Sequence, residues 1–206
     1  MQPSSDIHMS PETFFAWLPS QEKRYELVDG VPVMMAGAGR RHDRVVVNSI
    51  STLNAQLRGG PCQTFSGDTY VATAGKNQRM PDVGVDCGKP DDDSMVADKP
   101  SLLIEILSRT TRAIDVTTKL QEYQELESLD YVLLVDTDHP KVQFYSRKED
   151  RYWTSTVIEG LDSVIPLEKL GISLSLSEIY FGLEFRSKPR LVQDEPEESS
   201  SSYGPK

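Results

Sequence analysis

Long hydrophobic runs are missing from this sequence of 206 residues. No apolar stretch approaches the roughly 20 residues that a helix needs to cross a bilayer. The first twelve residues, MQPSSDIHMSPE, also lack the basic stretch followed by an apolar stretch that marks a signal peptide. These absences argue against a protein held in a membrane, and they predict a cytoplasmic location.

Cysteine is scarce. The chain has two, Cys62 and Cys87, and each lies in a strand-like stretch without a second Cys or His at the spacing of metal ligands. This argues against both a disulfide framework and a zinc site. The sequence therefore predicts two buried, reduced thiols.

Basic residues are outnumbered, with 22 Lys and Arg against 32 Asp and Glu and a formal net charge of -10. Binding nucleic acid through overall charge needs basic side chains that displace counterions, so only a local basic patch remains available. Part of the acidity lies in residues 187–206, which are rich in Ser, Pro and Glu and have no apolar period. We expect a flexible N-terminus at 1–9, a single domain over 10–186 and a disordered tail at 187–206.

The N-terminal part of the chain predicts a helix, a hairpin and a second helix. Ser10–Glu12 supplies an N-cap, a proline at the first helical position and an acidic first turn. Asp29-Gly30 lies between two short apolar runs, which indicates a β-hairpin. Apolar residues then recur at three- and four-residue steps from residue 41 until Gly59-Gly60-Pro61, which predicts a helix of several turns.

The remainder predicts strands and helices in alternation. In chain order we expect strands within 62–74 and 80–87, a strand at 101–107 buried on both faces, a helix from Thr110 or Thr111 through Leu126, a strand at 131–136, an antiparallel pair at 141–147 and 151–158, and a short helix within 175–183. This order predicts an α/β domain with a central mixed β-sheet flanked by helices, preceded by the N-terminal helix and hairpin.

Two of these strands carry an acid where an apolar residue would cost less to bury. Asp82 begins the strand in RMPDVGVD, and Glu105 lies inside SLLIEIL. Two buried carboxylates close together need a cation between them, and Mg²⁺ commonly takes one or two carboxylates together with water and phosphate oxygens. The alternatives are that Glu105 pairs with an arginine such as Arg112, or that either acid points into solvent at a strand end.

A lysine on the next helix extends this pattern. Lys119 and Tyr123 are four residues apart in DVTTKLQEYQEL and so share a helix face, which could look back at the acids. A lysine beside two carboxylates and a metal is suited to stabilising negative charge on a phosphoryl group attacked by water. The alternative is a solvated lysine paired with Asp115, four residues before it.

Several ordered blocks resemble a known family. The segments RMPDV, LLIEILSRTTRAID, KLQEY and DYVLLVDTDHPKVQFY are similar to the Uma-two family of endonucleases, a bacterial branch of the PD-(D/E)XK, restriction-endonuclease-like superfamily. The resemblance extends upstream to RYELVDGVPVMM and RRHDR and downstream to LEKLGISLSLSEIY. It therefore covers the chain from Ser10 to Leu183.

The resemblance implies a restriction-endonuclease-like fold in which Asp82 and Glu105 are catalytic ligands of Mg²⁺ or Mn²⁺. One position departs from the superfamily pattern, which has a lysine two residues after the glutamate, where this chain has Leu107. The resemblance then assigns the catalytic lysine to Lys119 on the next helix. Tyr123 is similar to the helix-borne Gln and Tyr motif of some related nucleases.

Further candidates lie in the same blocks. Glu26 is a candidate additional metal ligand or water-orienting group. His42 is a candidate for contacting phosphate or for hydrogen-bonding a carboxylate. The alternative, which fits the sequence equally well, is a polar residue at the start of a helix with no catalytic or binding role. Three arginines crowd the start of the second helix, where the helix dipole disfavours cations, so we expect them to contact the nucleic-acid backbone. They are Arg40, Arg41 and Arg44.

These observations predict a metal-dependent endonuclease that hydrolyses phosphodiester bonds of DNA, and the fold analogy implies a homodimer. The alternative is a catalytically inactive relative that keeps the fold and binds nucleic acid or another protein. Leu107 and the net acidity of the chain keep that alternative open.

Overall fold

The structure is a computed structural model that describes residues 8–89, 91–107 and 113–185, with side chains in the last range from residue 116 onward. Several sequence-based expectations fall outside the described residues. They are the disordered tail at 187–206, most of the flexible N-terminus at 1–9, the helix cap at Thr110 or Thr111, the partner Arg112 and the side chain of Asp115.

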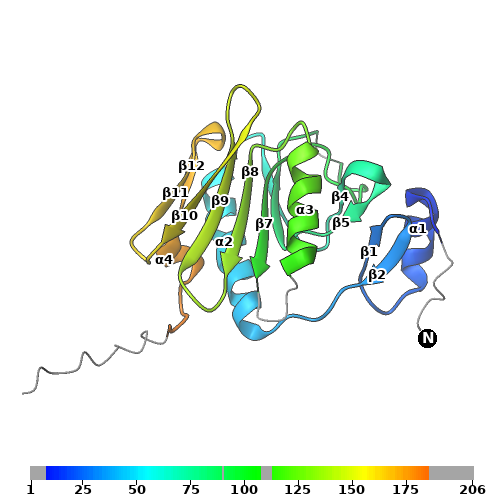
Figure 1. Cartoon of the computed structure of the whole chain (residues 1–206), viewed down its shortest axis with the longest axis horizontal. Helices are drawn as coiled ribbons and strands as arrows, with labels where there is room; N and C mark the ends of the chain where they lie inside the picture. The colour runs from blue at the N-terminus through cyan, green and yellow to red at the C-terminus, as the bar shows by residue number, and fades with distance from the viewer. Residues whose placement is uncertain (1–7, 90, 108–112, 186–206) are drawn as a thin grey trace, which may run out of the picture.

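Most helices and strands follow the expected order (Figure 1), but the antiparallel pair at Val164–Leu167 and Ile172–Ser175 was not predicted. The helices are α1 (Pro11–Trp17), α2 (Arg40–Leu57), α3 (Ala113–Glu125) and α4 (Leu176–Ile179), with short 3-10 helices η1 (Leu18–Ser20), η2 (Ala74–Lys76) and η3 (Glu168–Leu170). The strands are β1 (Tyr25–Val28), β2 (Val31–Met34), β3 (Gln63–Ser66), β4 (Val71–Ala72), β5 (Gln78–Arg79), β6 (Val83–Asp86), β7 (Pro100–Leu107), β8 (Tyr131–Asp136), β9 (Lys141–Arg147), β10 (Trp153–Glu159), β11 (Val164–Leu167) and β12 (Ile172–Ser175). Within these ranges no helix is both long and apolar enough to cross a membrane.

The central sheet is mixed, as the sequence predicts. Its six strands follow the order β10-β9-β8-β7-β6-β3, and β7 and β8 are its parallel pair while the other neighbours are antiparallel. A parallel pair needs a crossover connection, and α3 lies in that connection. Figure 1 shows α3 on one face of this sheet and α2 on the other.

Strand β7 is buried on both faces because its alternate side chains enter two different cores. Ile104 packs in the core that includes Val45 of α2, whereas Leu103 packs in the core that includes Tyr123 of α3. Successive side chains of a strand point to opposite faces, so Glu105 shares the face of Leu103. The apolar run SLLIEIL thus directs its one acid toward α3.

A smaller sheet lies beside the central one and has the strand order β2-β1-β5-β4. Helix α1 begins as expected, with the Ser10 side chain accepting a hydrogen bond from Thr13 N. The β1–β2 hairpin also forms as expected, since Asp29 and Gly30 both have positive φ, as its two-residue turn requires. Strand β5 continues into β6 through residues 80–82, so Asp82 lies where the two sheets join.

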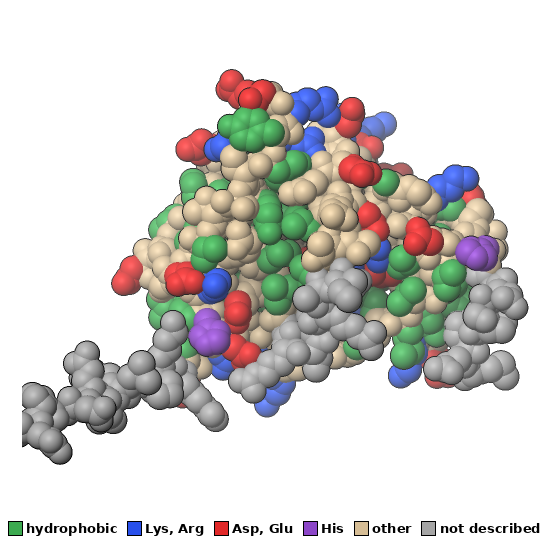
Figure 2. All heavy atoms as spheres, viewed as in Figure 1, with side chains coloured by type: hydrophobic (Ala, Val, Ile, Leu, Met, Phe, Trp, Pro, Cys, Tyr) green, Lys and Arg blue, Asp and Glu red, His purple; other side chains and the backbone are tan. Residues whose placement is uncertain are grey.

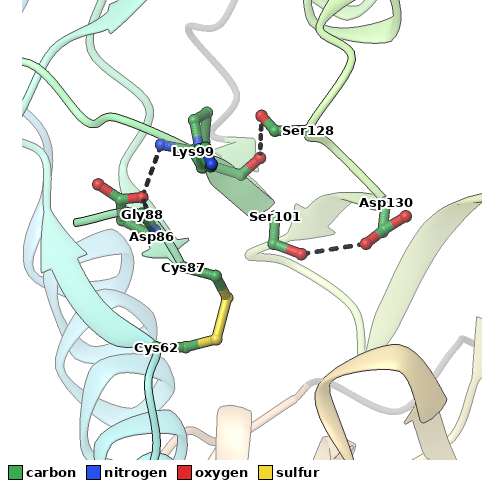
Figure 3. Close-up of a disulfide and its surroundings, with 9 residues drawn as sticks. Cys62, Asp86, Cys87, Gly88, Lys99, Ser101, Ser128 and Asp130 are labelled. Carbon is green, nitrogen blue, oxygen red and sulfur yellow. Dashed lines mark hydrogen bonds between the residues drawn. A yellow bond between two sulfur atoms is a disulfide. The ribbon is translucent and has the colours of Figure 1, made fainter.

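The prediction of two reduced thiols is wrong. Cys62 and Cys87 form a disulfide (Figure 3). Gln63 of β3 pairs with Asp86 of β6 in antiparallel register, so the next residues outward face each other. Sequence spacing concealed this pair because the two cysteines are 25 residues apart and only the strand pairing brings them together.

Candidate active site

The predicted site residues meet at the junction of the two sheets. They come from five elements or their connections: Glu26 from β1, His42 from α2, Asp82 from the residues before β6, Glu105 from β7, and Lys119 with Tyr123 from α3. Val83 pairs with Ile104 in antiparallel register, which places the preceding Asp82 beside Glu105. The side chains therefore converge although they are spread over much of the chain.

Asp82 is fixed from two sides. Its Oδ2 accepts a hydrogen bond from Ile106 N at 2.7 Å, and its Oδ1 lies 3.1 Å from His42 Nε2. The side chain is partly exposed, at 22%. The carboxylate is thereby tied to β7, one residue after Glu105, and it keeps access to solvent or substrate.

Glu105 is buried and accepts two hydrogen bonds on one oxygen. Tyr123 OH donates to Oε1 at 2.7 Å and Lys119 Nζ donates to the same atom at 3.4 Å. Burial raises the pKa of Glu105 to about 7; Asp82 and Glu26 add to the rise, and Lys119 and Tyr123 oppose it. Ionising Glu105 is therefore costly in this buried position, although Lys119 and Tyr123 lie against it.

Lys119 is buried between two carboxylates. Its Nζ lies 2.8 Å from Glu26 Oε1 and 3.4 Å from Glu105 Oε1, and the residue is 6% exposed. Tyr123 lies on the same helix face and reaches the same glutamate, which confirms the shared face expected from the spacing. The alternative of a solvated lysine is ruled out by this burial.

Glu26 belongs to the site and does more than the sequence suggested. Its Oε1 accepts a hydrogen bond from Met80 N at 2.9 Å, and its Oε2 accepts one from Arg79 Nη1 at 3.2 Å. Sequence reasoning missed Arg79 and its main partner Glu122. Arg79 lies inside the RMPDV segment, but no pattern pairs it with an acid 43 residues away.

His42 lies against the metal-ligand candidate Asp82. Burial disfavours its charged form, but the hydrogen bond and charge of Asp82, with smaller contributions from Glu105 and Asp43, raise the pKa of His42 overall. The imidazole is thus placed to orient Asp82, and Asp82 favours its protonated form.

The three arginines of α2 have different surroundings. Arg40 and Arg44 are exposed. Arg41 donates to the carbonyl oxygens of Thr137 and Glu184, both at 3.0 Å, and it stacks on a phenylalanine ring. Lys and Arg side chains are dispersed among acidic ones on the face in Figure 2, so any contact with phosphate depends on a local patch.

The donor set fits a hard divalent cation. Among residues 8–89, 91–107 and 116–185 no group of three or more His, Cys, Asp and Glu side chains is arranged to hold a metal. Two carboxylates suffice for Mg²⁺ or Mn²⁺ when water and substrate oxygens complete the coordination. Asp82 and Glu105 are such a pair, and a cation bound between them would favour the ionised form of Glu105, which burial disfavours.

Comparisons with known proteins agree on the family and the fold. Uncharacterized protein slr1290 of Synechocystis sp. PCC 6803 is 28% identical over 179 residues, which cover 86% of this chain and 94% of that protein. Uncharacterized protein sll1609 of the same organism is 27% identical over 147 residues, covering 69% and 83%.

A crystal structure of a protein from Anabaena variabilis, described as a putative nuclease belonging to DUF820, superposes with a TM-score of 0.68 at 18% identity and covers 84% of this chain and 97% of that one. Together with the mixed sheet, this likeness shows the restriction-endonuclease-like fold expected from the sequence. A family model described as Uma2, putative restriction endonuclease, matches residues 11–177. Because that match includes both sheets and every candidate site residue, the chain belongs to the Uma2 family.

Proposed function

We propose that this protein is a divalent-metal-dependent endonuclease that hydrolyses phosphodiester bonds in DNA. The observation that carries the proposal is the convergence of Asp82, Glu105 and Lys119. Lys119 Nζ lies 3.4 Å from Glu105 Oε1, and Asp82 accepts a hydrogen bond from the backbone N–H of Ile106, the residue after Glu105. The description of the family as restriction endonucleases supports DNA as the substrate.

Asp82 and Glu105 would hold Mg²⁺ or Mn²⁺ in this reaction. A bound divalent cation supplies charge neutralisation at the phosphate and lowers the cost of ionising water. Glu105 Oε1 is held by Tyr123 and Lys119, and Asp82 is held by His42 and Ile106 N, so neither carboxylate has to reorganise when the substrate arrives.

Lys119 would stabilise the charge that develops on the phosphate during attack. Its ammonium lies against Glu105, so it is adjacent to any group that Glu105 holds. Glu26 keeps that ammonium in place from the other side, at 2.8 Å. Preorganised positive charge at a developing oxyanion is typically the largest contribution to such catalysis.

Arg40 and Arg44 would bind the DNA backbone beside the site. They lie on the first turns of α2, the helix that carries His42, and both are exposed. Contacts from arginine to phosphate orient the duplex without reading its sequence. Arg41 shares that turn, but its guanidinium already binds Thr137 and Glu184.

The assembly we propose is a homodimer. Strand β10 is an edge of the central sheet, and its residues Ser155, Thr156 and Val157 are exposed and uncharged. An uncharged edge of this length can pair with a second copy. Light scattering of the purified protein tests this, and substitution Thr156→Lys at the edge should yield monomers if β10 forms the contact.

The test of function is nicking of supercoiled plasmid DNA in Mg²⁺ or Mn²⁺, compared with EDTA. We expect cleavage with either metal, none in EDTA, and loss of cleavage in Asp82→Asn and Glu105→Gln. Both substitutions keep the size of the side chain, so thermal melting should show folded protein. Added Mn²⁺ should stabilise the original protein by about 2.7 kcal/mol at a metal concentration of 100 times Kd. It should stabilise neither variant, and thermal melting measures both effects.

Two results would count against the proposal. Cleavage that persists in Asp82→Asn would show that the Asp82 carboxylate is not a required metal ligand. Absence of cleavage with Mg²⁺ or Mn²⁺, combined with gel-shift binding to DNA, would favour the inactive, nucleic-acid-binding alternative.

A further inference from the structure

Arg79 is buried between two carboxylates, those of Glu26 and Glu122. The residue is 2% exposed. Its Nε and Nη2 donate to the two oxygens of Glu122, at 2.8 and 2.5 Å, and its Nη1 donates to Glu26 Oε2 at 3.2 Å. One guanidinium therefore joins a carboxylate of the site to a carboxylate outside it.

Glu122 has further partners that fix its position. Its Oε2 accepts a hydrogen bond from Thr73 Oγ1 at 2.7 Å, and its Oε1 accepts one from Asn77 Nδ2 at 3.0 Å. Asn77 in turn accepts a hydrogen bond from the backbone of the β1–β2 turn, at Asp29 N. The network thus ties α3 to the smaller sheet and to the hairpin that carries Glu26.

The same network determines where Lys119 lies. Glu122 follows Lys119 by three residues, so the two side chains occupy neighbouring positions on one side of α3. Lys119 contacts Glu26 through Oε1, and Arg79 contacts the same carboxylate through Oε2. Any rotation of α3 or of the Glu26 carboxylate would therefore change both contacts together.

Charge balance explains why Glu122 matters for Glu26. Glu122 neutralises most of the charge of Arg79 through two hydrogen bonds, whereas Glu26 receives one longer bond. Without Glu122, the buried guanidinium would have Glu26 as its remaining acidic partner among its described contacts and would draw that carboxylate away from Lys119. A buried charge left without its partner is strongly unfavourable, so this shift is the expected response.

We infer that Arg79 and Glu122 are positioning residues that hold the side chains of Glu26 and Lys119 in place beside Glu105. The inference rests on the proposed nuclease function, and it assigns the pair a role besides stability. Replacing a buried ion pair by apolar side chains of similar size is often neutral or stabilising for the fold. If the pair mattered for stability alone, an apolar replacement would restore both folding and activity.

The experiment compares Arg79→Met, Glu122→Met and the double variant with the original protein. Thermal melting measures stability, and cleavage of a DNA duplex in Mn²⁺ gives kcat and KM. We expect each single variant to lose stability and the double variant to regain most of it. In the double variant we expect kcat to stay reduced by about 100-fold, the typical effect of a misplacement near 1 Å, with KM unchanged.

Arg147→Met is the matched control. Arg147 is also a buried arginine at α3, where it donates to the carbonyl oxygens of Gln124, Leu126 and Glu127 at the end of the helix. It contacts none of the site residues through these bonds. This variant should lose stability and, below its melting temperature, keep the kcat of the original protein.

A second readout does not depend on cleavage. Acetic anhydride acetylates exposed lysines, and mass spectrometry measures the rate at Lys119 relative to the exposed Lys148. Lys119 should react slowly in the original protein and in Arg147→Met, and faster in the Arg79 and Glu122 variants. If the original protein cuts no DNA, the proposed function fails while this footprint still decides the positioning role. A double variant with original kcat, or with Lys119 still protected, would overturn the inference.

Discussion

The Lys119 ammonium lies 2.8 Å from Glu26 Oε1 and 3.4 Å from Glu105 Oε1, so it is closer to the glutamate of the hairpin than to the proposed metal ligand. Both carboxylates are buried. A lysine in this position balances charge in the folded protein and lies ready beside the reacting phosphate. These two roles make its substitution informative.

We predict that Lys119→Gln lowers both activity and stability. Loss of one preorganised positive donor should reduce kcat by about 100- to 1,000-fold. Loss of the counter-charge leaves Glu26 and Glu105 without their shared cation, which typically costs about 3–5 kcal/mol for a buried pair. Plasmid cleavage and urea unfolding measure the two effects.

Lys141→Gln is the control for Lys119→Gln. Lys141 forms an exposed ion pair with Glu159, at 3.2 Å, on the β9–β10 hairpin. An exposed pair contributes little to stability, so both cleavage and unfolding should stay near those of the original protein. A Lys119→Gln variant that behaves like this control would remove Lys119 from the catalytic group.

A second prediction concerns acid stability. Burial raises the pKa of the Glu122 carboxyl. The hydrogen bonds from Arg79, Thr73 and Asn77 and the charge of Arg79 outweigh burial and lower the pKa below its ordinary value of 4.5. The unfolded chain then binds the proton more readily than the folded one. The stability that Glu122 contributes is present above pH 4.5 and is lost as the pH falls through the lowered value.

The measurement is the free energy of unfolding by urea between about pH 5 and about pH 3, for the original protein and for Glu122→Gln. The original protein should lose stability more steeply, because the amide of the variant does not titrate in this range. Parallel curves over this window would contradict the lowered pKa. Exposed Glu149→Gln is the control, and its curve should follow that of the original protein.

Much of the fold could be predicted because it is determined locally. Ser10–Glu12 contains the cap and first turn of α1, and Asp29-Gly30 contains the whole turn of the first hairpin. The apolar run 101–107 is long enough to indicate a strand with two covered faces, and β7 is such a strand. The four-residue spacing of Lys119 and Tyr123 likewise fixes their shared face on α3 without tertiary information.

The parts that escaped prediction depend on pairing between distant segments. The stretch 62–74 reads as strand throughout, yet it divides into β3 in the central sheet and β4 in the smaller one. Cys62 and Cys87 become partners only through the β3–β6 register, and Arg79 finds Glu122 only when β5 packs beside α3. The local preferences of residues for helix or strand do not specify which distant segments pair.

A third prediction follows from the Cys62–Cys87 disulfide. The bond closes a loop with a sequence separation of 25, which corresponds to about 3.5 kcal/mol in the chain-entropy account. We expect reductant to lower the melting temperature of the original protein and to have no effect on a Cys62→Ser, Cys87→Ser double variant. Equal melting with and without reductant would show that the two thiols are not joined in solution.

A fourth prediction concerns the contact of Gly84 with Phe65, which pair across β6 and β3. A Cβ at position 84 would collide with the Phe65 ring, so Gly84→Ala should destabilise the fold by about 1–3 kcal/mol through overpacking. In the double variant with Phe65→Leu the clash is relieved, so the two substitutions should couple favourably in a double-mutant cycle. Gly37→Ala is the control, since a Cβ there would meet nothing within 4 Å. Additive effects of Gly84→Ala and Phe65→Leu would show that β3 does not hold the ring over Gly84.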